Sequence, residues 1–113
     1  MIRRLWEHAG MTCAMRRCAF EAPCGYVLVP EWHPLHGAKY EEAESRLDVH
    51  GGVTFAGDLE GLGYAVGFDM SHACDVKFIP GTCYVIPMRT DEESAEETNR
   101  LAEQPAVLAE RDA

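Results

Sequence analysis

Six polar residues in the middle of the chain have the types and positions that metal or ligand chemistry requires. They are four histidines and two aspartates, His33, His36, His50, His72, Asp69 and Asp75. Most of them lie beside a proline, a glycine or the end of an apolar run, where loops on a rigid scaffold tend to carry function. We expect any ligand-binding or active site of this protein to be built around these side chains.

Two local patterns strengthen this expectation. Asp69, His72 and Asp75 are three residues apart and directly follow an apolar run, so one helical turn would place them on the same face. His50 precedes Gly51–Gly52, where a backbone without side chains lets a ligand approach closely. Taken alone, His50 is more simply interpreted as a structural histidine, and Gly51–Gly52 as a β-bulge. The combination of the two patterns favours a shared pocket.

Two chemistries suit such a pocket. Histidine and aspartate bind divalent metals, and imidazole suits zinc, iron or nickel. In a metal-dependent hydrolase, His50, Asp69 and His72 would be the ligands, with Asp75 or His36 as the base or as a support for a ligand.

The alternative is a binding protein that holds a nucleotide-like small molecule. The histidines would donate to phosphate or ribose, Trp32 and Tyr40 would stack on a base, and Arg46 and Arg89 would supply positive charge. The chain has no P-loop, G-x-G-x-x-G, H-E-x-x-H or G-x-S-x-G motif. We therefore favour binding over catalysis and name neither a catalytic residue nor a cofactor.

The charge distribution limits the partners. The net charge is −9, with +2 in residues 1–30 and −11 in the remainder. An acidic domain has few counterions to release from a nucleic-acid backbone, so we expect no direct nucleic-acid binding. The acidic stretches 41–44 and 91–97 instead suggest a third function, inhibition of another protein through an acidic face. With no long apolar segment and no secretory signal, we expect a cytosolic protein and no membrane contact.

The five cysteines are irregularly spaced: Cys13, Cys18, Cys24, Cys74 and Cys83. This odd number without a C-x-x-C pair argues against a disulfide scaffold and predicts buried free thiols. Cys74 lies two residues from His72, which makes it a weak candidate nucleophile.

The remaining sequence predicts a single α+β domain over residues 24–113, preceded by an irregular N-terminal arm over residues 1–23. We expect a small antiparallel sheet of about four strands and a short helical segment at 38–46. The predicted strands are 26–29, 47–50 continuing into 53–56, 63–69 and 82–86, with a loop at 70–81. We expect 47–56 and 63–69 to pair as a hairpin, which would place His50 and Asp69 on neighbouring strands.

An acidic helix is predicted at about 91–104, before Pro105. Thr90 and Glu93 have the spacing of a capping box. The apolar stripe of this helix is too thin to hold it firmly on a core, and a small domain gains from burying apolar patches against a second copy. We therefore expect a homodimer with residues 91–109 in the interface.

Four segments carry a resemblance to a known family. They are Gly25–Pro30, His33–Gly37, Asp48–Phe55 and Gly67–Asp75. Together with 99–104, they make residues 24–104 similar to a family of small, uncharacterised proteins from tailed-phage and prophage genomes. The resemblance implies a phage setting, where small acidic proteins often counter host defence. In that setting the cytosol is that of the host cell, and the acidic face would inhibit a host defence protein. By analogy, we expect sequestration of a nucleotide-like molecule in the His/Asp-lined pocket.

Overall fold

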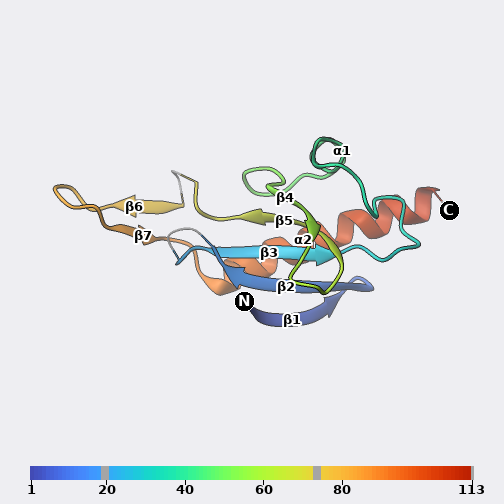
Figure 1. Ribbon diagram of the computed structural model, residues 1–113, viewed down its shortest axis with the longest axis horizontal. Helices are drawn as coiled ribbons and strands as arrows, with labels where there is room; N and C mark the ends of the chain where they lie inside the picture. The colour runs from blue at the N-terminus through green and yellow to red at the C-terminus, as the bar shows by residue number, and fades with distance from the viewer. Residues whose placement is uncertain (19–20, 73–74, 113) are drawn as a thin grey trace.

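The chain folds into an antiparallel sheet with one long helix along a face of the sheet (Figure 1). The computed structural model describes residues 1–18, 21–72 and 75–112, with side chains described as far as residue 104. The elements are β1 (Ile2–His8), β2 (Met11–Arg17), β3 (Pro23–Leu28), α1 (Tyr40–Arg46), β4 (Phe55–Asp58), β5 (Tyr64–Asp69), β6 (Val76–Phe78), β7 (Val85–Pro87) and α2 (Asp91–Asp112). The predicted α+β class and both helical segments are confirmed.

The main sheet has five strands in the order β1-β2-β3-β5-β4, and every neighbouring pair is antiparallel. β6 and β7 form a separate two-stranded sheet. The sheet is therefore larger than the predicted four strands, because its first two strands come from the region that we expected to be irregular.

The prediction of an irregular arm at residues 1–23 was wrong. Strands β1 and β2 form a hairpin whose two turn residues, Ala9 and Gly10, have φ values of 54° and 78°. Two positive φ values suit the twist of a two-residue hairpin. Consecutive β2 residues Cys13 and Ala14 pack into cores on opposite faces of the sheet. A strand that is buried on both faces lacks the alternation by which strands are recognised.

The predicted strand at 47–50 is also absent. This segment is irregular, although Leu47 and Val49 are buried in the main core, as their alternation suggested. The predicted hairpin with 63–69 forms only from Phe55 onward, between β4 and β5.

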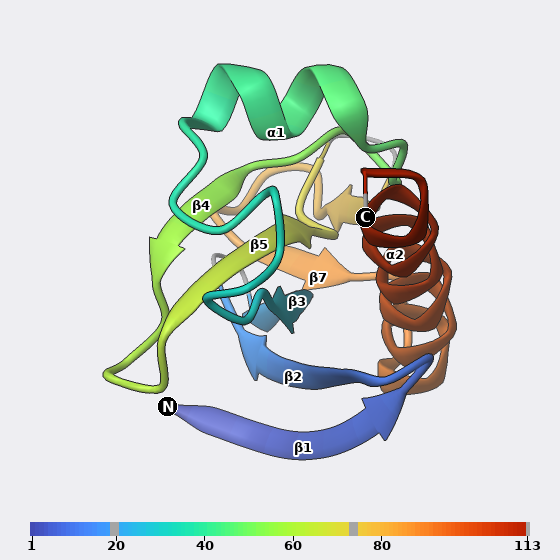
Figure 2. The ribbon, with the colours of Figure 1, turned by 90° about the vertical axis from the view of Figure 1, so that its right-hand side faces the viewer.

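Helix α2 covers one face of the sheet, and α1 lies beyond the β4 edge (Figure 2). The buried residues of α2 are Ser94, Thr98, Leu101 and Ala102. A Cβ atom at Gly25 of β3 would clash with Thr98, so this glycine lets the helix approach the sheet. The small polar residues Ser94 and Thr98 are thus buried together with Leu101 and Ala102, which widens the buried face of the helix. The prediction that the helix is only weakly anchored was wrong.

The start of α2 agrees with the sequence. Thr90 accepts the Glu93 N–H at 3.1 Å, and the Glu93 carboxylate accepts the Thr90 N–H at 3.0 Å, which confirms the capping box. The helix does not end before Pro105 but continues to Asp112. A proline in a helix lacks one N–H donor, and here this does not terminate it.

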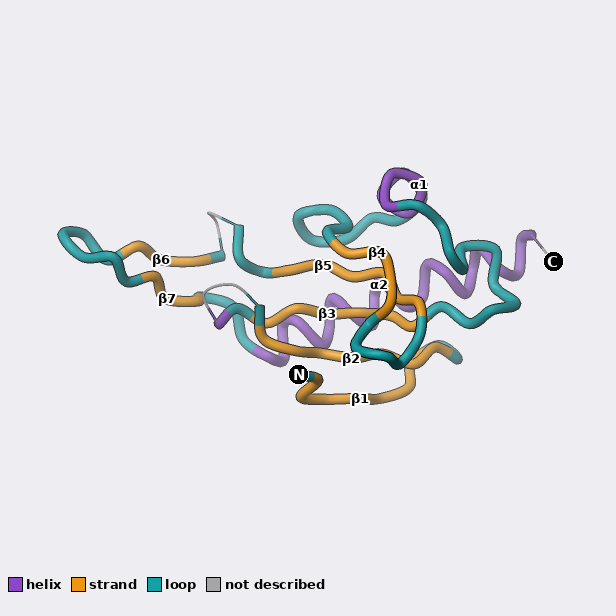
Figure 3. The backbone as a smooth tube through the Cα atoms, viewed as in Figure 1, coloured by secondary structure: helices purple, strands orange, loops and turns teal. Residues whose placement is uncertain are grey.

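The β6–β7 hairpin projects beyond the end of the main sheet (Figures 1 and 3). Its first strand lies inside the segment predicted to be a loop. Phe78, Tyr84 and Ile86 are exposed on it. At its base, the Met88 N–H donates to the Asp75 carbonyl at 2.8 Å, so both ends of the hairpin meet at Asp75.

Candidate metal-binding site

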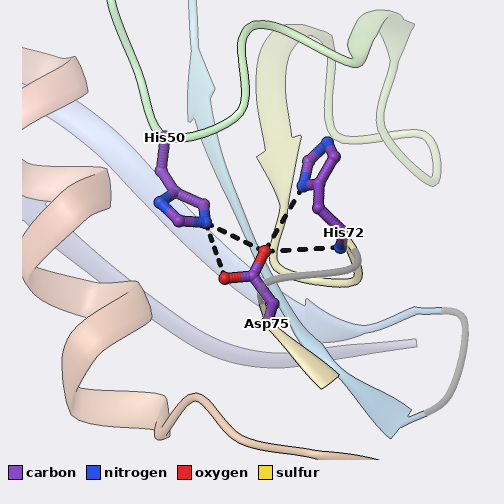
Figure 4. A group of neighbouring side chains, drawn as sticks. All are labelled: His50, His72 and Asp75. Carbon is purple, nitrogen blue, oxygen red and sulfur yellow. Dashed lines mark hydrogen bonds and ion pairs between the residues drawn. The ribbon is translucent and has the colours of Figure 1, made fainter. Parts of the chain in front are cut away.

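A buried carboxylate, Asp75, lies at the centre of the site, and its side chain has no exposed surface. His50 Nε2 lies 2.8 Å from Oδ1 and 2.9 Å from Oδ2. Arg89 Nε donates to Oδ1 at 2.8 Å, and His72 Nδ1 lies 3.3 Å from Oδ2. Two imidazoles from separate loops therefore converge on one carboxylate (Figure 4).

A tight turn positions His50. The Gly52 N–H donates to the Val49 carbonyl at 2.8 Å, and the His50 N–H donates to the Glu97 carboxylate of α2 at 2.6 Å. Gly51 has a φ of +70°, and a Cβ atom there would clash with the His72 ring. Only glycine therefore lets the two imidazoles approach, with ring centroids 6.1 Å apart.

The three-residue spacing of Asp69, His72 and Asp75 does bring them together, but not through the predicted helical turn. Asp69 ends β5, and the Asp75 N–H donates to the His72 carbonyl at 2.8 Å. Asp69 Oδ1 accepts the Ser71 hydroxyl at 2.8 Å and lies 3.5 Å from His72 Nδ1. Asp69 thus lies beside the cluster, while Asp75 is at its centre.

Hydrogen bonds keep the central carboxylate ionised. Burial by itself raises the pKa of Asp75, but the hydrogen bonds from Arg89 and His50 outweigh burial and lower the pKa to about 2. The same bond to Asp75, followed by that to Glu93, raises the pKa of Arg89. The site therefore presents an anionic oxygen donor between two imidazole nitrogens.

His33 and His36 do not join this cluster. They follow Leu28 at one end of the β3–β5 ladder, whereas Asp69 pairs with Cys24 at its other end. His33 is buried, and its Nδ1 accepts the Leu35 N–H at 3.0 Å, which indicates a structural role. His36 lines a different cavity.

The hollow beside His50 contains groups that the sequence did not assign to the site. Its volume is about 360 Å³, and its lining is His50, Met70, Arg89, Glu93, Glu96, Glu97 and Arg100. Arg89 was expected to attract phosphate but pairs with Asp75, and Glu97 was seen only as part of an acidic face. No local pattern could reveal these roles, because α2 and the His50 turn meet only in the folded chain.

The cysteines differ from the predicted set of buried free thiols. Cys18 and Cys24 form a disulfide between the end of β2 and the start of β3. Cys13 is buried and free, and burial, helped by Glu7, raises its pKa to about 11. Cys83 is free but exposed. The candidate nucleophile Cys74 lies outside the described residues.

Comparison with known protein families, curated proteins and solved structures finds no match for this chain. Within the described part of the chain, no helix combines the length and the hydrophobicity needed to cross a bilayer. The cytosolic location stays a prediction.

Proposed function

We propose that this protein binds a divalent transition-metal ion through His50, His72 and Asp75. The observation that carries the proposal is the convergence of three donor atoms, two imidazole nitrogens and one carboxylate oxygen, all within 4.8 Å of one another. Three protein ligands with further positions open are typical of zinc sites that bind a water or substrate, and two histidines with one carboxylate also suit iron(II).

The surroundings support a metal site over a purely structural ion pair. Arg89 holds Oδ1 of Asp75 and leaves Oδ2 facing the imidazoles. Such outer hydrogen bonds orient metal-binding carboxylates. The imidazoles remain partly exposed, with side-chain exposures of 26% for His50 and 36% for His72, so an ion can reach them. This geometry favours Asp75 as the carboxylate ligand, whereas Asp69 lies 3.5 Å from the same nitrogen of His72, at the edge of the cluster.

Metal titration of untagged protein tests the proposal. Wild type is expected to bind about one equivalent of zinc, cobalt or nickel, and His50→Gln with His72→Gln is expected to abolish this binding. His8→Gln is a matched control, because His8 pairs with Glu103 on the surface. Less than about a tenth of an equivalent in wild type, or equal binding by the double variant, would overturn the proposal.

A second candidate function is the sequestration of a nucleotide-like molecule in the hollow beside His50. Arg89 and Arg100 supply positive charge there, but both pair with acidic side chains, and three glutamates line the same hollow. A phosphate ligand would therefore depend on the metal to offset this charge. Thermal shifts with cyclic dinucleotides and ADP-ribose isomers, with and without metal, test this function. No stabilisation at high concentration would argue against it.

The homodimer and the acidic inhibitor also stay predictions. Because α2 buries its own stripe against the sheet, a dimer interface there would have to use the outer face of the helix. Light scattering on the full chain tests the dimer. Charge reversal at Glu92 and Glu96, on the exposed side of α2, tests inhibition through the acidic face.

A further inference from the structure

A second cavity lies at the end of the sheet opposite to the metal-binding cluster. Its volume is about 430 Å³, within the usual range for small-molecule sites. Its lining comes from the β1–β2 turn, the loop after β3 and the β4–β5 turn, and consists of Gly10, Met11, Thr12, Leu28, Val29, Pro30, Glu31, Trp32, His36, Leu62, Gly63 and Tyr64. None of these residues belongs to the metal-binding cluster.

Three rings, those of Trp32, His36 and Tyr64, line this cavity. Trp32 is 70% exposed and Leu62, which also lines the cavity, is 48% exposed, so both leave apolar surface facing water. The rings of His36 and Tyr64 lie 5.4 Å apart. His36 Nδ1 bonds to the Val29 carbonyl at 2.7 Å, and the Tyr64 hydroxyl donates to the Ala38 carbonyl. These bonds hold both rings in place before any ligand arrives.

Three polar side chains of the cavity, His36, Thr12 and Glu31, can each offer a hydrogen-bond acceptor. A carbonyl can only accept, so His36 Nδ1 carries the hydrogen and its Nε2 is an acceptor in the neutral ring. The Thr12 hydroxyl donates to Glu7 at 2.8 Å, which leaves its oxygen to accept. Glu31 adds a carboxylate, and the described lining contains neither lysine nor arginine. This charge pattern disfavours an anion and favours a cation.

We propose that this cavity binds an organic cation, an amine or quaternary ammonium compound about the size of choline. Aromatic faces attract such cations, and the attraction strengthens when the cation leaves water. Trp32 and Tyr64 would contact the cationic head, and Glu31 would balance its charge. Binding would also cover the exposed surface of Trp32 and Leu62.

Calorimetric titration with choline tests the proposal against its neutral isostere, 3,3-dimethylbutan-1-ol, in which carbon replaces nitrogen. We expect choline to bind at least about tenfold more tightly than the isostere, because the two differ in charge and hardly in shape. Trp32→Ala is expected to weaken choline binding by about tenfold or more, and Glu31→Gln by about fivefold. Both side chains are exposed, so these variants should stay folded, as circular dichroism will verify.

Two controls distinguish choline binding in this cavity from a general effect of surface charge and from the proposed metal site. Glu92→Gln removes an exposed carboxylate on α2 and should leave choline binding unchanged. The variant that lacks both cluster histidines, His50 and His72, should also bind choline normally, so the two proposals can fail separately. Equal affinity for the isostere, no choline binding at about 10 mM, or wild-type affinity in Trp32→Ala would each overturn the proposal.

Discussion

Replacing Asp75 with asparagine removes the charge on which two imidazoles and a guanidinium converge. The substitution keeps the size of the side chain, so the packing around it changes little. Arg89 Nε and His50 Nε2, both 2.8 Å from the carboxylate, lose a charged acceptor. We therefore expect the Asp75→Asn variant to fold with reduced stability, and this loss of stability to depend on pH.

The expected loss of unfolding free energy follows from the lowered pKa of Asp75. Folding shifts the pKa of Asp75 from 3.8 to about 2, and at about 1.4 kcal/mol per pKa unit this shift gives at most about 2.5 kcal/mol. Solvent at the partly exposed partners, Arg89 and His50, screens the interaction, so we expect about 1–2 kcal/mol. Because the folded pKa is depressed, this stability is present above about pH 4 and is lost as pH falls towards about 2. The unpaired donors bring the total loss to about 2–3 kcal/mol at neutral pH.

Urea unfolding at about pH 7 and about pH 2.5 measures this effect. The free energy of unfolding of the variant should lie about 2–3 kcal/mol below wild type at neutral pH, and the gap should shrink by about 1–2 kcal/mol in acid. Asp48→Asn is the control, because Asp48 is 91% exposed and should change stability by less than about 0.5 kcal/mol. A gap below about 0.5 kcal/mol at neutral pH, or one that does not change with pH, would refute the reasoning.

Three further predictions concern single residues. Gly51→Ala should lower the free energy of unfolding by about 1–3 kcal/mol, because a Cβ atom there meets His72, whereas Gly37→Ala, with a similar φ but open space, should lose only about 1 kcal/mol. Thr90→Ala breaks the capping box and should lower the same free energy by about 1 kcal/mol in urea unfolding. In the native protein, iodoacetamide should modify the exposed Cys83 within minutes but leave the buried Cys13 intact, as peptide mass spectrometry can show. Rapid modification of Cys13, or equal losses for the two glycine variants, would contradict these expectations.

The sequence predicted best those elements whose signals are local. The capping box at Thr90 depends on two residues three positions apart, and the strand at 63–69 ends on the predicted aspartate. The hairpin of β1 and β2 escaped detection because burial on both faces removes the period of two from β2, and the Ala9-Gly10 turn lacks the usual asparagine.

In the candidate site, too, the residues with a local sequence pattern were predicted, and the contacts made only by the fold were not. Asp69, His72 and Asp75 were found together because their spacing is short. His50 was included for a partly wrong reason, since it lies in a turn and not on a strand beside β5. Arg89 reaches Asp75 only because β6 and β7 fold back on each other, and such long-range contacts depend on packing rather than on local pattern.

The base of the β6–β7 hairpin gives the site a mechanical consequence. Asp75 lies one residue before β6, and Arg89 lies two residues after β7. Their ion pair therefore connects the two ends of the hairpin. A metal bound by the proposed ligands His50, His72 and Asp75 would restrain Asp75, and through the Asp75–Arg89 ion pair it would also restrain both ends of the hairpin. Hydrogen exchange of amides along the projecting hairpin is therefore expected to slow when metal binds, which would report occupancy of the site at a distance from it.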